Sequence, residues 1–218
     1  MEIKKDSFRV VKPRLIENLS EIEIDIQEME EEIILELGIV NNYFFEDQEK
    51  EGVRCQQMIF KNCVFSQVSL NKIELVDVLF ENCDLSNVEF CEGSLHRVEF
   101  KNCKVLGLNL SDSRMHNVTF TECNGEHSFF RFSNLKVVEF LSCQMRHADF
   151  QGCIFSKVRF EDCDLFLSQM SGAKLKGIDF SSCIIEGMGV RIEDLAGAIV
   201  SPLQAVNLAK LMGLIVTP

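Results

Sequence analysis

The residue types with chemical potential in this chain are ten cysteines and four histidines, and most of them recur at a spacing of twenty residues. The histidines form two such pairs, His96 with His116 and His127 with His147. Seven cysteines form one series, at Cys63, Cys83, Cys103, Cys123, Cys143, Cys163 and Cys183. Imidazoles and thiolates bind transition metals, and thiolates are also nucleophiles. The common spacing therefore needs a structural explanation before metal, redox or nucleophilic chemistry is assigned.

Motifs that would support such chemistry do not accompany these residues. The sequence has no C-x-x-C pair, no glycine-rich phosphate loop and no G-x-S-x-G nucleophile motif. Neither histidine pair has a third ligand at a position related to it by the same spacing of twenty. Both pairs are therefore interpreted as exposed residues stacked on one another at the surface. The sequence predicts a protein that is not an enzyme, with no catalytic residue, no cofactor and no metal site.

Composition and charge restrict the classes of partner. The chain has 218 residues, 46% hydrophobic and 26% charged, with a net charge of -12 and a pI near 4.8. This acidity argues against direct binding to nucleic acid and to anionic membranes. No apolar run reaches the length of a membrane span, and the N-terminal segment lacks the apolar core of a signal peptide. We expect a cytoplasmic protein with free thiols.

A period of five residues determines the predicted architecture. From Phe60 to Val200, every fifth residue is large and apolar except Gly125, and the residues two positions before them are mostly small or β-branched. This period is neither helical nor that of a plain strand. Four five-residue sides make one square coil of twenty residues, and stacked coils place residues i and i+20 above one another. Each side turns its apolar pair inward and its other three residues toward solvent.

The same register explains most cysteines as packing residues. Eight of them occupy the small inward position, the seven named above and Cys153. Coils stacked about 4.8 Å apart hold neighbouring Cβ atoms wider than the roughly 3.8 Å of a disulfide, so these thiols are expected to act as small buried hydrophobes. Cys55 takes a central position. Cys91 points outward and is the one candidate for a reactive thiol, although simple exposure is the favoured interpretation.

Gly125 leaves a gap in the middle of the apolar series. The favoured interpretation is a local bulge whose defect is covered by Phe129 and Phe132, which sit at outward positions. The alternative is that these two aromatic residues form a contact patch for a partner.

Segments such as CDLSN (83–87), ADFQG (148–152), CDLFL (163–167) and AKLKG (173–177) resemble the consensus of the pentapeptide-repeat family. This resemblance covers about residues 53–200 and implies an all-β fold, a right-handed quadrilateral β-helix. Upstream, the register weakens and fails at Gln48 and Lys50. We therefore expect an N-terminal cap with an irregular first coil in residues 1–52, and a C-terminal dimerisation helix and tail in residues 201–218.

The C-terminal segment begins with Ser201-Pro202-Leu203-Gln204, which has the pattern of a capping box with proline at the first helical position. Gly213 is placed to end the helix. A short apolar helix over the last coil leaves a surface that a second copy would bury. The residues predicted to carry this homodimer are Leu203, Ala205, Leu208, Ala209, Met212 and Leu214.

Three stretches, SPLQAVNLAKLMGL, GSLHRVEF (93–100) and SFFRFSNL (128–135), resemble the Qnr-type quinolone-resistance branch of the family. That resemblance implies an acidic rod that mimics duplex DNA, binds DNA gyrase or topoisomerase IV, and protects them from fluoroquinolones. No insertion breaks the register, so no loop residues are carried over. The candidate partner-facing acidic columns are Glu81, Asp84, Glu99, Glu139, Glu161, Asp164 and Asp179. Two alternatives stay open, a scaffold protein and an immunity protein against a gyrase toxin.

Overall fold

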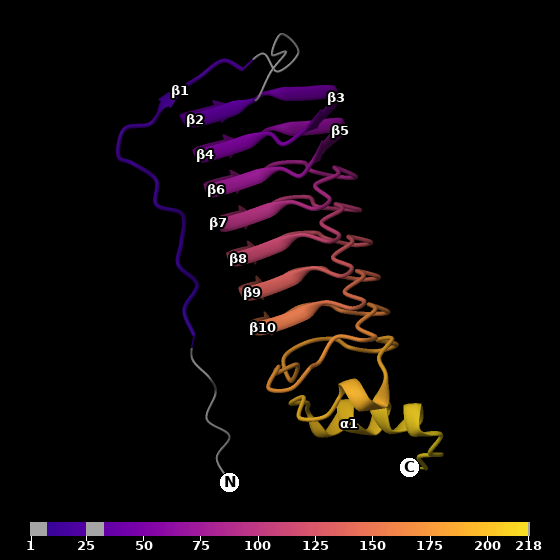
Figure 1. Cartoon of the computed structure of the whole chain (residues 1–218). Helices are drawn as coiled ribbons and strands as arrows, with labels where there is room; N and C mark the ends of the chain where they lie inside the picture. The colour runs from indigo at the N-terminus through magenta and orange to yellow at the C-terminus, as the bar shows by residue number, and fades with distance from the viewer. Residues whose placement is uncertain (1–7, 25–32, 218) are drawn as a thin grey trace.

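The computed structural model describes residues 8–24 and 33–217, which form a rod of stacked coils with a short helix at one end (Figure 1). Within these residues, no helix is long and apolar enough to cross a membrane. The strands of the rod are β2 (Ile34–Asn41), β3 (Phe44–Glu51), β4 (Arg54–Lys61), β5 (Val64–Asn71), β6 (Glu74–Glu81), β7 (Ser94–Lys101), β8 (Arg114–Thr121), β9 (Asn134–Leu141) and β10 (Ile154–Glu161).

All coils are paired in parallel with a constant offset of twenty residues. One sheet follows the order β1-β2-β4-β6-β7-β8-β9-β10, where β1 is Ser20–Glu21, and a second contains β3 and β5. Single parallel bridges continue the second side as far as Gln169 with Gly189, and Asp179 with Ile199 is a further bridge in the last coil. The structure confirms the predicted fold class, a quadrilateral β-helix with one short C-terminal α-helix.

The square cross-section comes from a left-handed residue at every fifth position. In β4, for example, Gln57 has φ 51° in the middle of the strand, so the strand turns one corner and spans two sides. Most corner residues are Asn, Asp, Gly or other polar types, which tolerate this conformation best. Val137, with φ 57°, is the one β-branched residue among the left-handed corners that the structure describes, and a β-branched side chain strains this backbone conformation.

The inward residues form continuous ladders, as predicted. Phe80, Phe100, Phe120 and Phe140 stack with ring centroids 4.6–5.0 Å apart and interplanar angles of 3–4°. The eight cysteines of the small inward position are buried. Their thiols contact backbone carbonyls, as Cys83 Sγ does with the carbonyl of Phe60 at 3.3 Å. This confirms that they are packing residues.

The first coil differs from expectation. Residues 33–52 were predicted to be irregular, but β2 pairs with β4 and β3 with β5 at the same offset of twenty. The polar Gln48 keeps its inward position because its Nε2 donates to the Glu46 carbonyl at 2.7 Å, and it is 7% exposed. Hydrogen bonds between coils therefore hold the register where the apolar pattern fails.

Gly125 causes no bulge, so that prediction is wrong. The bridges Asn124 with Gln144 and Phe129 with Asp149 keep the offset of twenty on both sides of it. A Cβ atom on Gly125 would lie 2.6 Å from Met145 Sδ, so the larger side chain of the next coil fills the space. Phe129 and Phe132 stay outside, 37% and 60% exposed.

The N-terminal segment also differs from a simple cap. Residues 20–24 do cover the first coil, where β1 pairs with β2 and Ile24 is buried. Residues 8–19 instead run back along the side of the rod, beside the strands of the large sheet (Figure 1). We call residues 8–24 the strap. The part of the predicted cap in residues 1–7 and 25–32 lies outside the described residues.

The last coil is covered by η1 (Ile192–Asp194), α1 (Pro202–Ala209) and η2 (Lys210–Met212). The predicted capping box is present, with Gln204 N–H donating to Ser201 Oγ at 3.3 Å and Ser201 N–H to Gln204 Oε1 at 2.7 Å. Gly213 ends the helical segment with φ 75°.

Val137→Asn is expected to stabilise the protein by about 1 kcal/mol, because it relieves the strain of a β-branched residue in a left-handed corner. The reciprocal change at an exposed corner, Asn87→Val, is expected to destabilise it by a similar amount. Urea unfolding followed by circular dichroism measures both. Two changes of the same sign would contradict this account of the corners.

Candidate functional site

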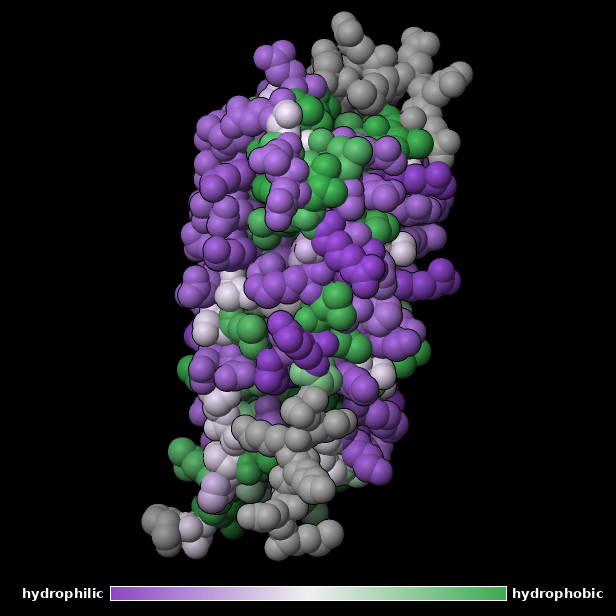
Figure 2. Space-filling model, turned by 90° about the vertical axis from the view of Figure 1, so that its left-hand side faces the viewer, coloured by the Kyte–Doolittle hydropathy of each residue, from purple (hydrophilic) through white to green (hydrophobic). Residues whose placement is uncertain are grey.

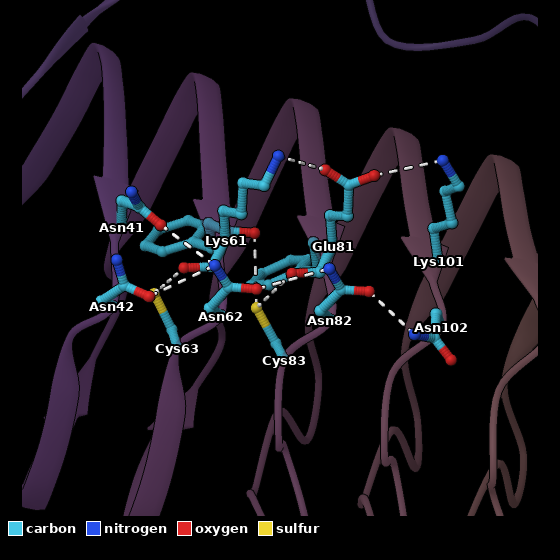
Figure 3. Close-up of polar contacts among 12 residues, drawn as sticks. Asn41, Asn42, Lys61, Asn62, Cys63, Glu81, Asn82, Cys83, Lys101 and Asn102 are labelled. Carbon is cyan, nitrogen blue, oxygen red and sulfur yellow. Dashed lines mark hydrogen bonds and ion pairs between the residues drawn. The ribbon is translucent and has the colours of Figure 1, made fainter.

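The predicted acidic columns are ladders of alternating charge. Glu81 lies between Lys61 and Lys101 of the neighbouring coils, with an N–O distance of 3.1 Å to each (Figure 3). These two ammonium groups lower the pKa of the Glu81 carboxyl. Asn82 and Asn102 form a parallel ladder beside them, with Asn102 Nδ2 donating to Asn82 Oδ1 at 2.8 Å. The carboxylate is therefore held and neutralised within the rod.

The other six predicted acidic residues also have partners, and for five of them the partner is a base. Three pair with a base of a neighbouring coil: Asp84 with Lys104, Glu139 with Arg159, and Asp164 with Arg146. Glu161 also approaches Arg159, Glu99 pairs with Lys12 of the strap, and Asp179 accepts from Ser181. The structure thus buries Glu139, which is 7% exposed, and it does not assemble the other six into a row of bare negative charge.

The strap adds cations and backbone donors to this surface. Its Lys12 Nζ is 3.6 Å from Glu99, and Val11 N–H donates to Asn117 Oδ1 at 3.1 Å. Gln57 Nε2 donates to the Arg14 carbonyl at 3.1 Å. Figure 2 views this side of the rod, where hydrophobic groups show between hydrophilic side chains along its length. The strap therefore covers part of the surface assigned to the predicted columns.

Asp77 is the buried polar centre of the strap contact. It is 5% exposed, and it accepts from Arg97 at 2.5 and 2.6 Å and from the Arg14 N–H at 2.8 Å. Burial alone would raise its pKa, but the hydrogen bonds from Arg97 and Arg14 outweigh this and lower the pKa of the carboxyl. Asp77 therefore stays charged and fixes the strap to the corner of the coil.

A different acidic surface, missed by the sequence reasoning, surrounds Cys91. Glu49, Glu89, Glu92 and Asp112 are all exposed. Glu49, Ser69 and Glu89 lie in one column of stacked residues. Glu92 and Asp112 occupy the same corner position in two successive coils. Within residues 8–24 and 33–217, none of the four forms an ion pair. We call these four residues the Cys91 acidic face. Its acids also recur at multiples of twenty, but nothing in the sequence showed that they lack the basic partners of the predicted columns.

The same carboxylates make Cys91 a poor nucleophile. Its thiol is half-buried, and burial together with the nearby Glu89 and Asp112 raises its pKa. A reactive cysteine needs a lowered pKa, so the hypothesis of a reactive thiol loses its physical basis. Burial likewise raises the pKa of Cys55 and of Cys153 to about 12 each.

The predicted dimer residues divide between two environments. Leu208 packs against the core of the last coil and Ala209 is half-buried, whereas Leu203 and Met212 are 71% and 63% exposed. Ala205 is exposed, and Leu214 is 55% exposed.

The C-terminal helix is attached to the last coil by Gln204, which the sequence analysis used only as part of the capping box. Its Nε2 donates to the carbonyls of Phe180 and Cys183 at 2.9 and 2.7 Å.

The two histidine pairs have different surroundings, and one of them has a carboxylate nearby that is not at a matching position of the repeat. His127 and His147 stack with ring centroids 4.8 Å apart, and Glu126 brings a carboxylate to within 4.8 Å of both. His96 and His116 have ring centroids 5.0 Å apart, and Arg97 contacts His96. Burial lowers the pKa of both residues of this second pair, and the charge of Arg97 adds to the effect.

The fold is a convex rod of stacked coils, with apolar residues in the interior and charged residues outside. Proteins of this class present surfaces for binding. Comparison with family models matches residues 93–170 to the pentapeptide repeat region. The same offset of twenty residues runs through the rest of the rod, so the matched region shares its architecture with the coils on either side of it.

The structure of a pentapeptide repeat protein, HetL, supports this fold. HetL, a pentapeptide repeat protein involved in heterocyst differentiation regulation in the cyanobacterium Nostoc sp. strain PCC 7120, is 14% identical; the match covers 77% of this chain and 84% of HetL, with a TM-score of 0.58. A trypsin-treated variant of QnrB1, a plasmid-mediated fluoroquinolone resistance protein, is 18% identical, covering 86% and 100% of the two chains with a TM-score of 0.49. No curated protein sequence matches the chain.

Arg97→Ala is expected to destabilise the protein by about 3 kcal/mol, because it leaves the buried Asp77 carboxylate without its cation. The control is Lys104→Ala, which breaks the solvated pair with Asp84 and is expected to change stability by less than about 1 kcal/mol. Urea unfolding at neutral pH measures both. Equal effects would show that burial does not distinguish these pairs.

The Arg97–Asp77 contact also predicts a pH dependence. The pKa of Asp77 is lower in the folded state than in the unfolded chain, so its stabilisation is present above the unfolded value of about 4. This stabilisation is lost as the pH falls through the lower pKa that Asp77 has in the folded state. The difference in unfolding free energy between the unaltered protein and Arg97→Ala should therefore shrink in acid, and a constant difference would contradict it.

Proposed function

We propose that this protein acts by binding and not by catalysis, as a rigid acidic rod that occupies the DNA-binding surface of a type II topoisomerase, DNA gyrase or topoisomerase IV. In this role it protects the enzyme from fluoroquinolones. The observation that carries the proposal is the Cys91 acidic face, where Glu49, Glu89, Glu92 and Asp112 are exposed and form no ion pair with the part of the chain that the structure describes. The resemblance of the C-terminal segment to Qnr-type proteins adds support.

Electrostatics favours the Cys91 acidic face over the predicted columns. A carboxylate already paired with lysine or arginine gains little from a basic partner, because the partner must displace the internal cation. Unpaired carboxylates raise the rate of association with a basic surface and are screened by salt. The partner contact is therefore assigned to this face, and its affinity should fall as ionic strength rises.

The dimensions of the rod are compatible with a DNA-sized groove. About seven coils at roughly 4.8 Å give a rod of about 35 Å from residue 53 to residue 200. Two such rods joined at their C-terminal ends would extend about 70 Å, close to the length of twenty base pairs. We propose that this dimer forms through Leu203, Met212 and Leu214, the exposed part of the predicted set.

A scaffold role is the second candidate, and a specific observation favours it. The alternating ion pairs along the rod, such as Lys61–Glu81–Lys101, neutralise much of the surface that a DNA mimic would present. The structural match to HetL, whose described role is in regulation of differentiation, is compatible with this candidate as well. An immunity role against a gyrase toxin would use the same surface as the first proposal.

A gyrase supercoiling assay, with purified protein titrated in the presence and absence of ciprofloxacin, tests the proposed function. Rescue of supercoiling at low micromolar protein is the expected result. Inhibition without rescue would keep DNA mimicry and remove the protective role. No effect on gyrase or on topoisomerase IV would leave the scaffold candidate.

Matched charge variants test the assigned face. Glu92→Gln with Asp112→Asn removes two charges from one corner column of the Cys91 acidic face, and is expected to raise the protein concentration needed for half-maximal effect about tenfold. Glu122→Gln with Asp162→Asn removes two exposed charges from another corner column, and should change it less than twofold. Equal loss in both variants would indicate a dependence on net charge and not on this face.

Leu203→Asp with Met212→Asp is expected to convert the dimer to a monomer, because both side chains are exposed at the C-terminal end and would become buried between two copies. Sedimentation equilibrium measures the mass. Ile154→Asp, at a 62% exposed position in β10, is the control and should leave the dimer intact. A monomeric unaltered protein would contradict the proposed interface.

A further inference from the structure

Glu126, His127 and His147 form a group of side chains whose ligand atoms lie within 4.8 Å of one another. Glu126 and His127 are adjacent in one coil, and His147 lies directly above His127 in the next coil. Among the residues that the structure describes, no other group of three histidine, cysteine, aspartate or glutamate side chains is placed in this way. Two imidazoles and a carboxylate are a ligand set suited to Zn²⁺.

The backbone fixes the distance between the two histidines. His127 N–H donates to the carbonyl of Arg146 at 2.9 Å, and His147 N–H to that of Phe166 at 2.9 Å. Both histidines are corner residues with φ 59° and 56°, so both Cα–Cβ bonds project from the same corner of the rod. The two ligands are thus positioned by the fold before any ion binds, which reduces the entropy lost on binding.

Small side-chain rotations bring the ligands to coordination distance. Zn–N bonds of about 2.0–2.1 Å at a tetrahedral angle require the two nitrogens to lie about 3.4 Å apart. The rings are 4.8 Å apart and nearly parallel, at 5°. Rotation about the broad terminal torsions of both rings tilts them toward a common ion, while the backbone stays in place.

The neighbouring arginine does not prevent this. Arg146 Nε is 3.9 Å from Glu126, a weak contact, and the same guanidinium is held more closely by Asp164 at 3.0 Å and by the ring of Phe166 at 4.5 Å. Asp164 and Phe166 therefore retain Arg146 when Glu126 turns to an ion. The carboxylate gains a divalent cation and loses only a long ion pair.

The second histidine pair provides a contrast within the same chain. His96 and His116 have the same offset of twenty residues, but their rings are tilted by 46° and no carboxylate completes a group of three. Arg97, which contacts His96, places a positive charge where an ion would bind. Ladder stacking of histidines is common to both pairs, whereas the three-ligand set belongs to one.

We propose that Glu126, His127 and His147 form a surface site for a divalent transition-metal ion, Zn²⁺ being the best match, with water completing the coordination. The ion would link two successive coils at the corner next to Gly125. The proposal is independent of the topoisomerase proposal, because it concerns a different surface and a different ligand.

Isothermal titration of Zn²⁺ into the reduced full-length protein tests the site. The protein carries Cys91→Ser so that the half-buried thiol does not compete. One ion per chain is expected to bind with a dissociation constant below about 100 μM. His147→Ala should abolish this binding, and Glu126→Gln, which keeps the shape of the side chain, should weaken it about tenfold or more.

His116→Ala is the matched control, because it removes a stacked histidine from the pair that lacks a carboxylate. Circular dichroism establishes that each variant is folded, and the thermal midpoint with and without Zn²⁺ gives a second measurement that only a native-state site would shift. Loss of binding in His147→Ala and Glu126→Gln with retention in His116→Ala supports the site. Unchanged binding in His147→Ala, or no saturable binding, would overturn it.

Discussion

The structure depends on the backbone hydrogen bonding between successive coils. These bonds place each residue next to the residue twenty positions later. A left-handed corner at every fifth residue, such as Gln57, keeps each coil square and so keeps this offset constant. The apolar pattern alone does not maintain it. The coil containing Gln48 and Lys50 stays in register through its hydrogen bonds although these two inward residues are polar. The columns of side chains on the surface of the rod follow from this stacking of equivalent positions.

Stacking favours identical residues when they are aromatic or amide and disfavours them when they are charged. Phenylalanine rings and the Asn62–Asn82–Asn102 amides repeat from coil to coil because each gains from its copy. Identical charges about 5 Å apart repel, so acidic columns acquire bases at alternate coils, as at Glu81. An unpaired acidic surface can therefore arise only where acids are separated by a neutral residue or placed at a corner, as around Cys91.

The period made the fold and the inward residues predictable from sequence, since the same five-residue rule repeats along the whole rod. The capping box at Ser201 was predictable for a different reason, because that motif is recognised from four consecutive residues. The strap was not predictable, since the contact of Val11 with Asn117 joins residues 106 positions apart and follows no period. The neutralisation of the acidic columns was missed because opposite charges were read as interruptions of a column and not as its ion-pair partners.

The same reasoning explains why the search for a third metal ligand failed at the sequence level. A ligand was sought at a multiple of twenty from His127, but Glu126 is its immediate neighbour in the chain. Adjacent residues in a strand point to opposite faces, whereas Glu126 and His127 lie at a left-handed corner, where the chain turns. A corner can therefore bring neighbouring side chains toward one point. In this fold, corners are the positions where different residue types converge, and the sides are where like residues stack.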